Sequence, residues 1–165
     1  MIIYIKNKHS LKVDDFKFRC CIGKNGKSKK KKEGDKKTPI GQFAVEDLYY
    51  RSDRVKKPLT NLKCVKIKKN MGWCDDPNSK HYNKLIKIKK NLKSSYEKLY
   101  RKDSKYDLFI LIKYNYKKVK KNKGSAIFLH LTNDYSTTKG CVAIKKKDFL
   151  ILNKLINKKT KIKIT

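Results

Sequence analysis

The stretch FLHLTNDYSTTKGCVAI, from Phe128 to Ile144, joins two short apolar runs through a polar loop. The runs FLHL and CVAI predict buried strands, because short apolar segments bounded by turn residues are typical of sheet cores. His130 lies at the end of the first run and Cys141 at the start of the second. If the two strands pair antiparallel, both side chains come to the same edge of the sheet. Cys141 is then either a nucleophile served by His130 or a small apolar residue of a buried strand.

Most of the regular elements that the sequence predicts on either side of this stretch are strands. The apolar run YDLFILIKYNY (106–116) predicts a central strand that reaches FLHL through a polar hairpin loop ending at Gly124. The segment 145–158 predicts a helix, with Phe149, Leu152, Leu155 and Ile156 on one apolar face. A second, short helix is expected at 94–107, capped by Ser94 or Ser95 with Glu97 in its first turn. We therefore expect one mainly β domain over residues 1–165, because strands and helices do not alternate as in a parallel doubly wound sheet.

The net charge of +32 comes from 46 basic and 14 acidic residues. All but four of the basic residues are lysine, and the exceptions are Arg19, Arg51, Arg54 and Arg101. Because specific nucleic-acid sites favour arginine, and the lysines extend from end to end of the chain, we expect a compositional bias without a specific nucleic-acid partner. Non-specific binding to polyanions remains an alternative function, which salt would weaken.

The five cysteines do not form a recognisable metal or disulfide pattern. They are Cys20, Cys21, Cys64, Cys74 and Cys141, with no CxxC spacing and with the three histidines far apart in the sequence. We therefore expect no zinc site. Cys20 and Cys21 are neighbours in a strand, so at most one is expected to face the core. Cys74 is expected in a loop, where Asp75 and Asp76 would raise its pKa and make it a poor nucleophile.

Covalent thiol catalysis needs a thiolate, a base within reach and donors for the developing oxyanion. His130 can serve as the base for Cys141, and the backbone N–H groups of Gly140 and Cys141 can serve as the donors. Lys139 would add positive potential beside the thiol.

The chain shows no transmembrane segment and no recognisable signal peptide. Its longest apolar runs are far shorter than the roughly 20 residues that span a bilayer. The start MIIYIKNKHS has only four apolar residues before Lys6, fewer than a secretory signal needs.

Two motifs of the sequence, one at residues 33–43 and one at residues 128–144, resemble those of the L,D-transpeptidases, the YkuD-type peptidoglycan enzymes. Thr138, Gly140 and Cys141 match three of the four final positions of the family signature Ser/Thr-His-Gly-Cys, and His130 matches its upstream histidine. The block EGDKKTPIGQF (33–43) resembles the family's Gly-Asp…Thr-Pro-x-Gly-x-Phe segment. The stretches GWCDDP and GSAIFLH are similar to a bacterial branch of small, single-domain members.

The resemblance implies a mainly β fold, a sandwich or partly open barrel, with one C-terminal helix and short peripheral helices. It implies that Cys141 attacks the amide before the terminal D-alanine of a peptidoglycan stem peptide, while His130 handles the proton. The thioester would pass to the amine of another stem, without metal or organic cofactor. It also implies that Thr138 and Lys139 lie near the substrate and that the protein works in the cell envelope or periplasm.

This sequence departs from the family pattern at three points. Lys139 stands where many members have a second histidine, and Ala143 stands where many have arginine or asparagine. The loop from His130 to Cys141 is shorter than in the best-known members. Three alternatives stay open: an L,D-carboxypeptidase that uses water at the same site, an inactive protein that binds the cell wall, and a Lys-rich polyanion-binding protein. The sequence does not predict the oligomeric state.

Overall fold

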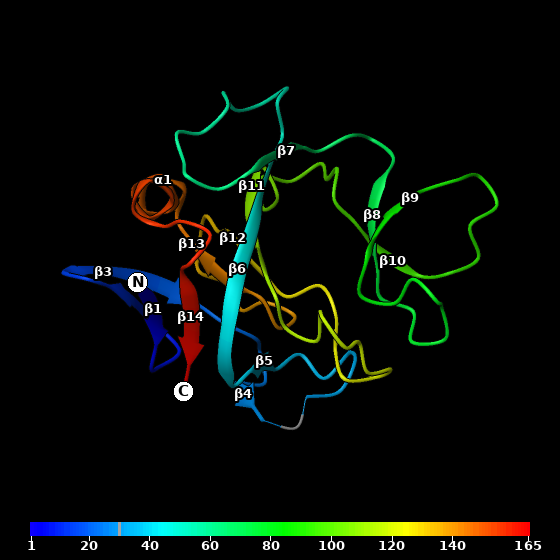
Figure 1. The fold of residues 1–165 in the computed structure, drawn as a ribbon, viewed down its shortest axis with the longest axis horizontal. Coiled ribbons are helices and arrows are strands. Elements are labelled where there is room, and N and C mark those ends of the chain that lie inside the picture. Colours follow the sequence, from blue (N-terminus) through cyan, green and yellow to red (C-terminus); the bar gives the residue numbers. More distant parts are fainter. Residues whose placement is uncertain (30) are drawn as a thin grey trace.

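The computed structural model describes residues 1–29 and 31–165, which form a mainly β fold (Figure 1). The strands are β1 (Ile2–Ile5), β2 (Ser10–Val13), β3 (Phe16–Cys21), β4 (Lys27–Ser28), β5 (Thr38–Pro39), β6 (Gly41–Tyr50), β7 (Cys64–Lys66), β8 (Met71–Cys74), β9 (Leu85–Lys87), β10 (Tyr96–Lys98), β11 (Leu108–Ile112), β12 (Phe128–Leu131), β13 (Val142–Ile144) and β14 (Lys161–Ile164). The helix α1 (Lys146–Leu155) lies between β13 and β14. The expected mainly β class is confirmed.

Among the described residues, the largest sheet has the order β11-β12-β13-β3-β2-β1-β14-β6-β7. It closes on itself because β6 also pairs antiparallel with β11, with Tyr49 opposite Phe109. The sheet is therefore barrel-like, as the resemblance implied, and β7 continues it beyond the closing pair. Closure removes exposed strand edges, which otherwise invite pairing with other chains.

The inside of this barrel is filled by alternate residues of its strands. In β14, for example, the sequence KIKI has Ile162 and Ile164 fully buried and its two lysines exposed. The same alternation buries Ile3 and Ile5 of β1. Period-two alternation of lysine and isoleucine thus places the excess positive charge in solvent and the branched apolar side chains in the core.

Strand β11 is buried on both faces and separates two apolar clusters. Leu108, Ile110 and Ile112 face the barrel core. Phe109 and Leu111 face a second cluster, which is built around Trp73 of the smaller sheet β10-β8-β9. Figure 1 shows this smaller sheet beside the barrel, on the side of β11 away from β14. The second cluster also contains Cys141, so the candidate nucleophile lies where the two sheets meet.

The C-terminal helix α1 forms where the spacing of apolar residues predicts it. Phe149 and Leu152 are fully buried against the barrel core, and Ile156 ends the helix as its C-cap. Lys145 occupies the N-cap position and makes no side-chain cap hydrogen bond. The helix has ten residues. No helix formed by the described residues is long and apolar enough to cross a membrane.

The prediction of a short helix at 94–107 is wrong. Tyr96–Lys98 forms strand β10, which pairs antiparallel with β8 and places Glu97 opposite Trp73. Ser95 does not cap a helix, because its hydroxyl donates to the Asp75 carboxylate at 2.6 Å. The Tyr96 ring packs against Gly72 of β8, so tertiary pairing determines the structure of this segment. Outside α1, the described residues form no peripheral helix.

Cys20 and Cys21 lie on opposite faces of β3, as expected, and only Cys20 belongs to the barrel core, whereas the expected loop position of Cys74 is wrong. Cys20 and Cys21 are both buried, because the face of β3 opposite the barrel core is covered near Thr132, with which the Cys21 thiol forms a hydrogen bond. Cys74 is the last residue of strand β8 and is fully buried, not a loop residue.

Candidate active site

Strands β12 and β13 run parallel, with Leu129 opposite Val142 and His130 opposite Ala143. The expected antiparallel pairing is therefore wrong. The connecting loop turns back along the segment after β3, where the Thr138 N–H donates to Ile22 O at 3.0 Å. This detour lets the chain enter β13 in the same direction as β12, so Cys141 comes to lie beside Phe128 at the start of β12.

The turn before Cys141 is held by the Thr138 side chain. The Thr138 hydroxyl accepts the Gly140 N–H at 3.1 Å and donates to the Cys141 carbonyl at 2.6 Å. Gly140 has a φ of +137°, and a Cβ there would lie 2.9 Å from the Lys37 carbonyl oxygen. Only glycine fits this backbone conformation and this close approach. Thr138, predicted to lie near the substrate, thus also shapes the turn that carries the thiol.

The Cys141 thiol is engaged by backbone groups of the segment that leads into β12. It donates to the Ala126 carbonyl at 3.2 Å and accepts the Phe128 N–H at 3.3 Å. Ala126 has a positive φ of 50°, which is strained for a residue other than glycine. The buried side chain of Asn83 supports that backbone, because its carbonyl oxygen accepts the Ala126 N–H and the Trp73 indole N–H.

The environment of Cys141 favours the neutral thiol. Burial, together with the negative charge of Glu97, raises the pKa of Cys141 to about 12. The Phe128 N–H and the positive charge of Lys31 act in the opposite direction. A thiolate at this position therefore depends on a proton acceptor and on nearby positive charge.

His130 is buried and is oriented by a backbone contact. Its Nδ1 lies 2.8 Å from the Leu131 carbonyl oxygen, which can only accept. Nδ1 is therefore the protonated nitrogen of the neutral ring, and Nε2 keeps its lone pair. Burial, assisted by the positive charges of Lys105 and Arg101, lowers the pKa of His130 to about 4. The Tyr106 ring packs edge-on against the imidazole, with centroids 5.3 Å apart.

Cys141 and His130 line the same cavity, whose volume is about 490 Å³. The other residues predicted near the substrate, Thr138 and Lys139, also line it, and so does Ala143. Gly140 lies behind Cys141 at the turn. The structure thus brings together all the residues that sequence reasoning selected. A thiol, a neutral imidazole with a free Nε2 and a glycine turn around one cavity can perform acyl transfer.

Sequence reasoning missed several side chains that line the cavity, among them Lys31, Glu97, Arg101 and Tyr106. Glu97 accepts a hydrogen bond from the Tyr106 hydroxyl at 2.9 Å and pairs with Arg101 at 3.4 Å. The serine cap at 94–95 predicts a helix over 94–107 with Glu97 in its first turn, whereas Glu97 lies in strand β10. Lys31 was indistinguishable from the other lysines of its loop.

No metal centre is formed by the part of the chain that the structure describes, since no three His, Cys, Asp or Glu side chains gather there. All five cysteines are free thiols.

A comparison with protein families matches residues 1–164 to the YkuD family model, described as the L,D-transpeptidase catalytic domain. Searches of curated proteins and of solved structures gave no significant match. The family match covers essentially the whole chain and agrees with the barrel-like fold. The chain belongs to the YkuD family of L,D-transpeptidase catalytic domains.

Proposed function

We propose that residues 1–165 form a single catalytic domain that acts as a peptidoglycan L,D-transpeptidase with Cys141 as its nucleophile. The observation that carries this proposal is the shared cavity of Cys141 and His130, in a chain that belongs to a family of cysteine-dependent transpeptidases. We further propose that the protein acts on stem peptides in the cell envelope, where such enzymes work.

In the proposed reaction, Sγ of Cys141 attacks the carbonyl carbon of the amide before the terminal D-alanine. His130 takes the thiol proton on Nε2 and gives it to the departing amine of D-alanine. The resulting thioester is then attacked by a side-chain amine of a second stem, which releases the thiol and forms a cross-link. No step requires a metal or an organic cofactor.

The oxyanion of the tetrahedral intermediate would be bound at the turn before β13. The Cys141 N–H is the main donor in this proposal, since it has no acceptor among the hydrogen bonds of the described residues. The Gly140 N–H, the second donor expected from the sequence, is engaged by the Thr138 hydroxyl. It would join the oxyanion site only if substrate displaces that hydroxyl. Lys139 is exposed at the cavity and would contact the substrate.

An L,D-carboxypeptidase is the second candidate, because water could replace the acceptor amine at the same site. The test is incubation of the protein with a purified tetrapeptide-stem muropeptide, followed by separation of the products. Transpeptidation gives cross-linked dimers and free D-alanine, whereas hydrolysis gives the tripeptide stem and D-alanine. Cys141→Ala should give neither product, and Cys64→Ser should match the wild type, since Cys64 lies in β7 away from the cavity.

A binding protein without catalysis is the third candidate, supported by the net charge of +32. It predicts that the wild type releases no D-alanine and that binding to anionic polymers weakens steeply with salt. Release of D-alanine by the wild type and not by Cys141→Ala would exclude it.

A further inference from the structure

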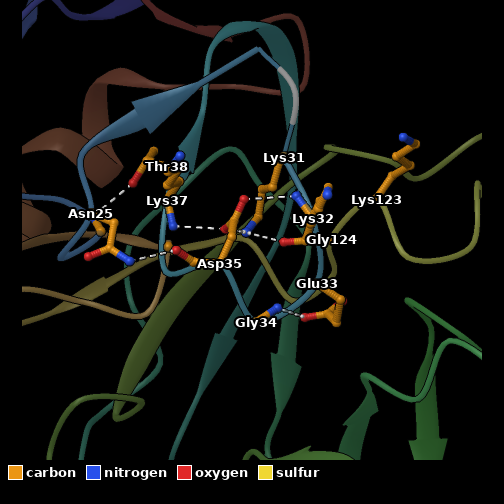
Figure 2. Close-up of polar contacts among 12 residues, drawn as sticks. Asn25, Lys31, Lys32, Glu33, Gly34, Asp35, Lys37, Thr38, Lys123 and Gly124 are labelled. Atoms are coloured by element: carbon orange, nitrogen blue, oxygen red, sulfur yellow. Dashed lines mark hydrogen bonds and ion pairs between the residues drawn. The ribbon is translucent and has the colours of Figure 1, made fainter.

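Lys31 is buried, unlike its exposed neighbour Lys32 in the Lys-rich loop between β4 and β5. Only 3% of its surface is exposed, which is rare for lysine, because the ammonium loses its hydration. Its Nζ compensates by pairing with Asp35 Oδ1 at 2.7 Å. Figure 2 shows the two side chains facing each other across the turn of this loop.

Asp35 is itself fixed by the backbone of its own loop. Its carboxylate accepts the Lys32 N–H at 2.8 Å and the Lys37 N–H at 2.9 Å (Figure 2). Partial burial opposes ionisation, but the hydrogen bonds from Lys31 and from these N–H groups hold the pKa of Asp35 below its ordinary value. The ammonium of Lys31 is therefore held at one position by an ionised, anchored partner.

Two glycines, Gly124 and Gly140, leave space for the Lys31 side chain between its backbone and the turn that carries Cys141. A Cβ at Gly124, where φ is +96°, would lie 2.7 Å from Cε of Lys31. A Cβ at Gly140 would lie 3.5 Å from Nζ. The side chain therefore passes over Gly124 and ends beside the residue that precedes Cys141. Lys31 and Cys141 line the same cavity.

The titratable groups that face Cys141 come from four parts of the fold. Glu97 of β10 opposes a thiolate, and Lys31 favours one. Tyr106 is buried, and burial raises its pKa well above the ordinary value, so it is neutral. His130 is neutral at neutral pH, since burial lowers its pKa to about 4. Further charges on the cavity wall are those of Glu33, Lys36, Asp75, Arg101, Lys105 and Lys139.

Proton transfer from Cys141 to His130 turns two neutral groups into a thiolate and an imidazolium. Burial and the charges of Lys105 and Arg101 oppose the imidazolium, and they outweigh the Leu131 carbonyl and Asp103, which favour it. On the thiolate side, the Phe128 N–H and Lys31 favour the negative charge. Lys31 is the buried cation beside the turn that carries Cys141.

We propose that Lys31 is a fixed positive charge that stabilises the Cys141 thiolate, held in place by Asp35 and by the space over Gly124 and Gly140. The biological purpose of this role rests on the proposed function. The effect of Lys31 on the thiolate does not, because the thiolate can be measured without any peptidoglycan substrate. Lys31 does not react with the substrate in this proposal. It acts on the reaction only through the charge of Cys141. Lys31 thus differs from Lys29 and Lys32 of the same loop, which are exposed and do not line the cavity.

The test compares the pH dependence of Cys141 alkylation by iodoacetamide in wild type and Lys31→Met. Peptide mass spectrometry resolves Cys141 from the other cysteines. Lys31→Met should raise the apparent pKa of Cys141 and slow its alkylation about tenfold for each unit of that rise. The matched control is Lys32→Met, which removes the same charge from an exposed neighbouring position and should leave the profile unchanged. Glu97→Gln should shift the profile in the opposite direction.

Loss of the Lys31 charge leaves Asp35 half-buried without its partner, so the single variant can unfold. A second variant combines Lys31→Met with Asp35→Leu, which removes both charges and keeps the apolar volume. Near-ultraviolet circular dichroism establishes that each protein is folded. A folded single or double variant with the wild-type alkylation profile would overturn the proposal. If the profile shifts while wild type releases no D-alanine from muropeptide, the Lys31 role stands and the proposed function fails.

Discussion

The thiol of Cys141 donates a hydrogen bond to the carbonyl oxygen of Ala126, 3.2 Å away, and not to His130. The His130 ring is in turn oriented by the Leu131 carbonyl through Nδ1. The site therefore contains two neutral groups, a thiol and an imidazole, around one cavity. Negative charge on sulfur arises only when the thiol proton moves away, which links reactivity to pH, to substrate and to nearby cations.

We expect Cys64, and not Cys141, to be the first cysteine labelled by a thiol reagent in the substrate-free protein. Cys64 is partly exposed, whereas Cys141 is nine-tenths buried and burial raises its pKa to about 12. Brief labelling with iodoacetamide at neutral pH, followed by peptide mass spectrometry, shows the order in which the cysteines are labelled. In Cys64→Ser, labelling of Cys141 should then rise steeply with pH. Faster labelling of Cys141 than of Cys64 at neutral pH would show that the site opens more readily than this structure indicates.

His130 should make the stability of the protein depend on pH. Burial lowers its pKa from 6.5 to about 4, so the unfolded chain binds a proton between these values that the folded protein does not. The free energy of unfolding should therefore fall as the pH drops from about 6.5 towards 4, by up to about 1.4 kcal/mol per unit from this residue. Urea unfolding at pH 7 and at pH 4.5 measures this difference in the free energy of unfolding.

The matched variant for this prediction is His130→Gln, which keeps a polar side chain and cannot take up the proton. The difference in unfolding free energy between wild type and variant should shrink, or reverse, at pH 4.5. A difference that stays the same at both pH values would contradict a buried, neutral His130.

Thr138→Val should impair catalysis more than folding. The variant loses the acceptor for the Gly140 N–H and the donor to the Cys141 carbonyl, so the turn that carries the thiol loses its support. We expect a stability loss of about 1 kcal/mol and a larger relative loss in D-alanine release. Thr138→Ser keeps the hydroxyl and should retain most of the activity. Equal activity of the valine and serine variants would show that the hydroxyl does not hold the turn.

Two glycine variants should separate backbone strain from crowding. Gly34 has a φ of +72° and open space around it, so Gly34→Ala should cost about 1 kcal/mol from backbone strain alone. Gly140 has a φ of +137°, and a new Cβ would lie 2.9 Å from the Lys37 carbonyl oxygen. Gly140→Ala should therefore destabilise the protein by clearly more. Thermal unfolding of both variants compares them, and equal losses would mean that the Lys37 backbone moves aside.

Much of the barrel could be predicted from the sequence because its strands are short and strongly patterned. The alternation of lysine and isoleucine in TKIKIT and the continuous apolar run of LFILI each determine burial directly. The helix at Lys146–Leu155 follows from the spacing of Phe149 and Leu152. The selected site residues were found through one histidine and one Gly-Cys turn, whose chemistry is visible in a linear sequence.

The rest depends on pairing between distant segments. Tyr96–Lys98 became a strand because β8 offers it a partner, and the parallel course of β12 and β13 depends on how their loop attaches beyond β3. Cys21 is buried by a segment more than a hundred residues away. Lys31 lies among similar lysines, and only the positions of Asp35 and Gly140 distinguish it.

The central claim is that Cys141 forms a covalent acyl-enzyme, and intact-mass analysis tests it most directly. Wild type and Cys141→Ala are incubated with a tetrapeptide-stem muropeptide and quenched in acid, which preserves thioesters. We predict an adduct on wild type equal to the muropeptide less D-alanine, located on Cys141 by fragmentation and absent from Cys141→Ala. An equal adduct on Cys141→Ala, or D-alanine release by that variant at the wild-type rate, would contradict the account.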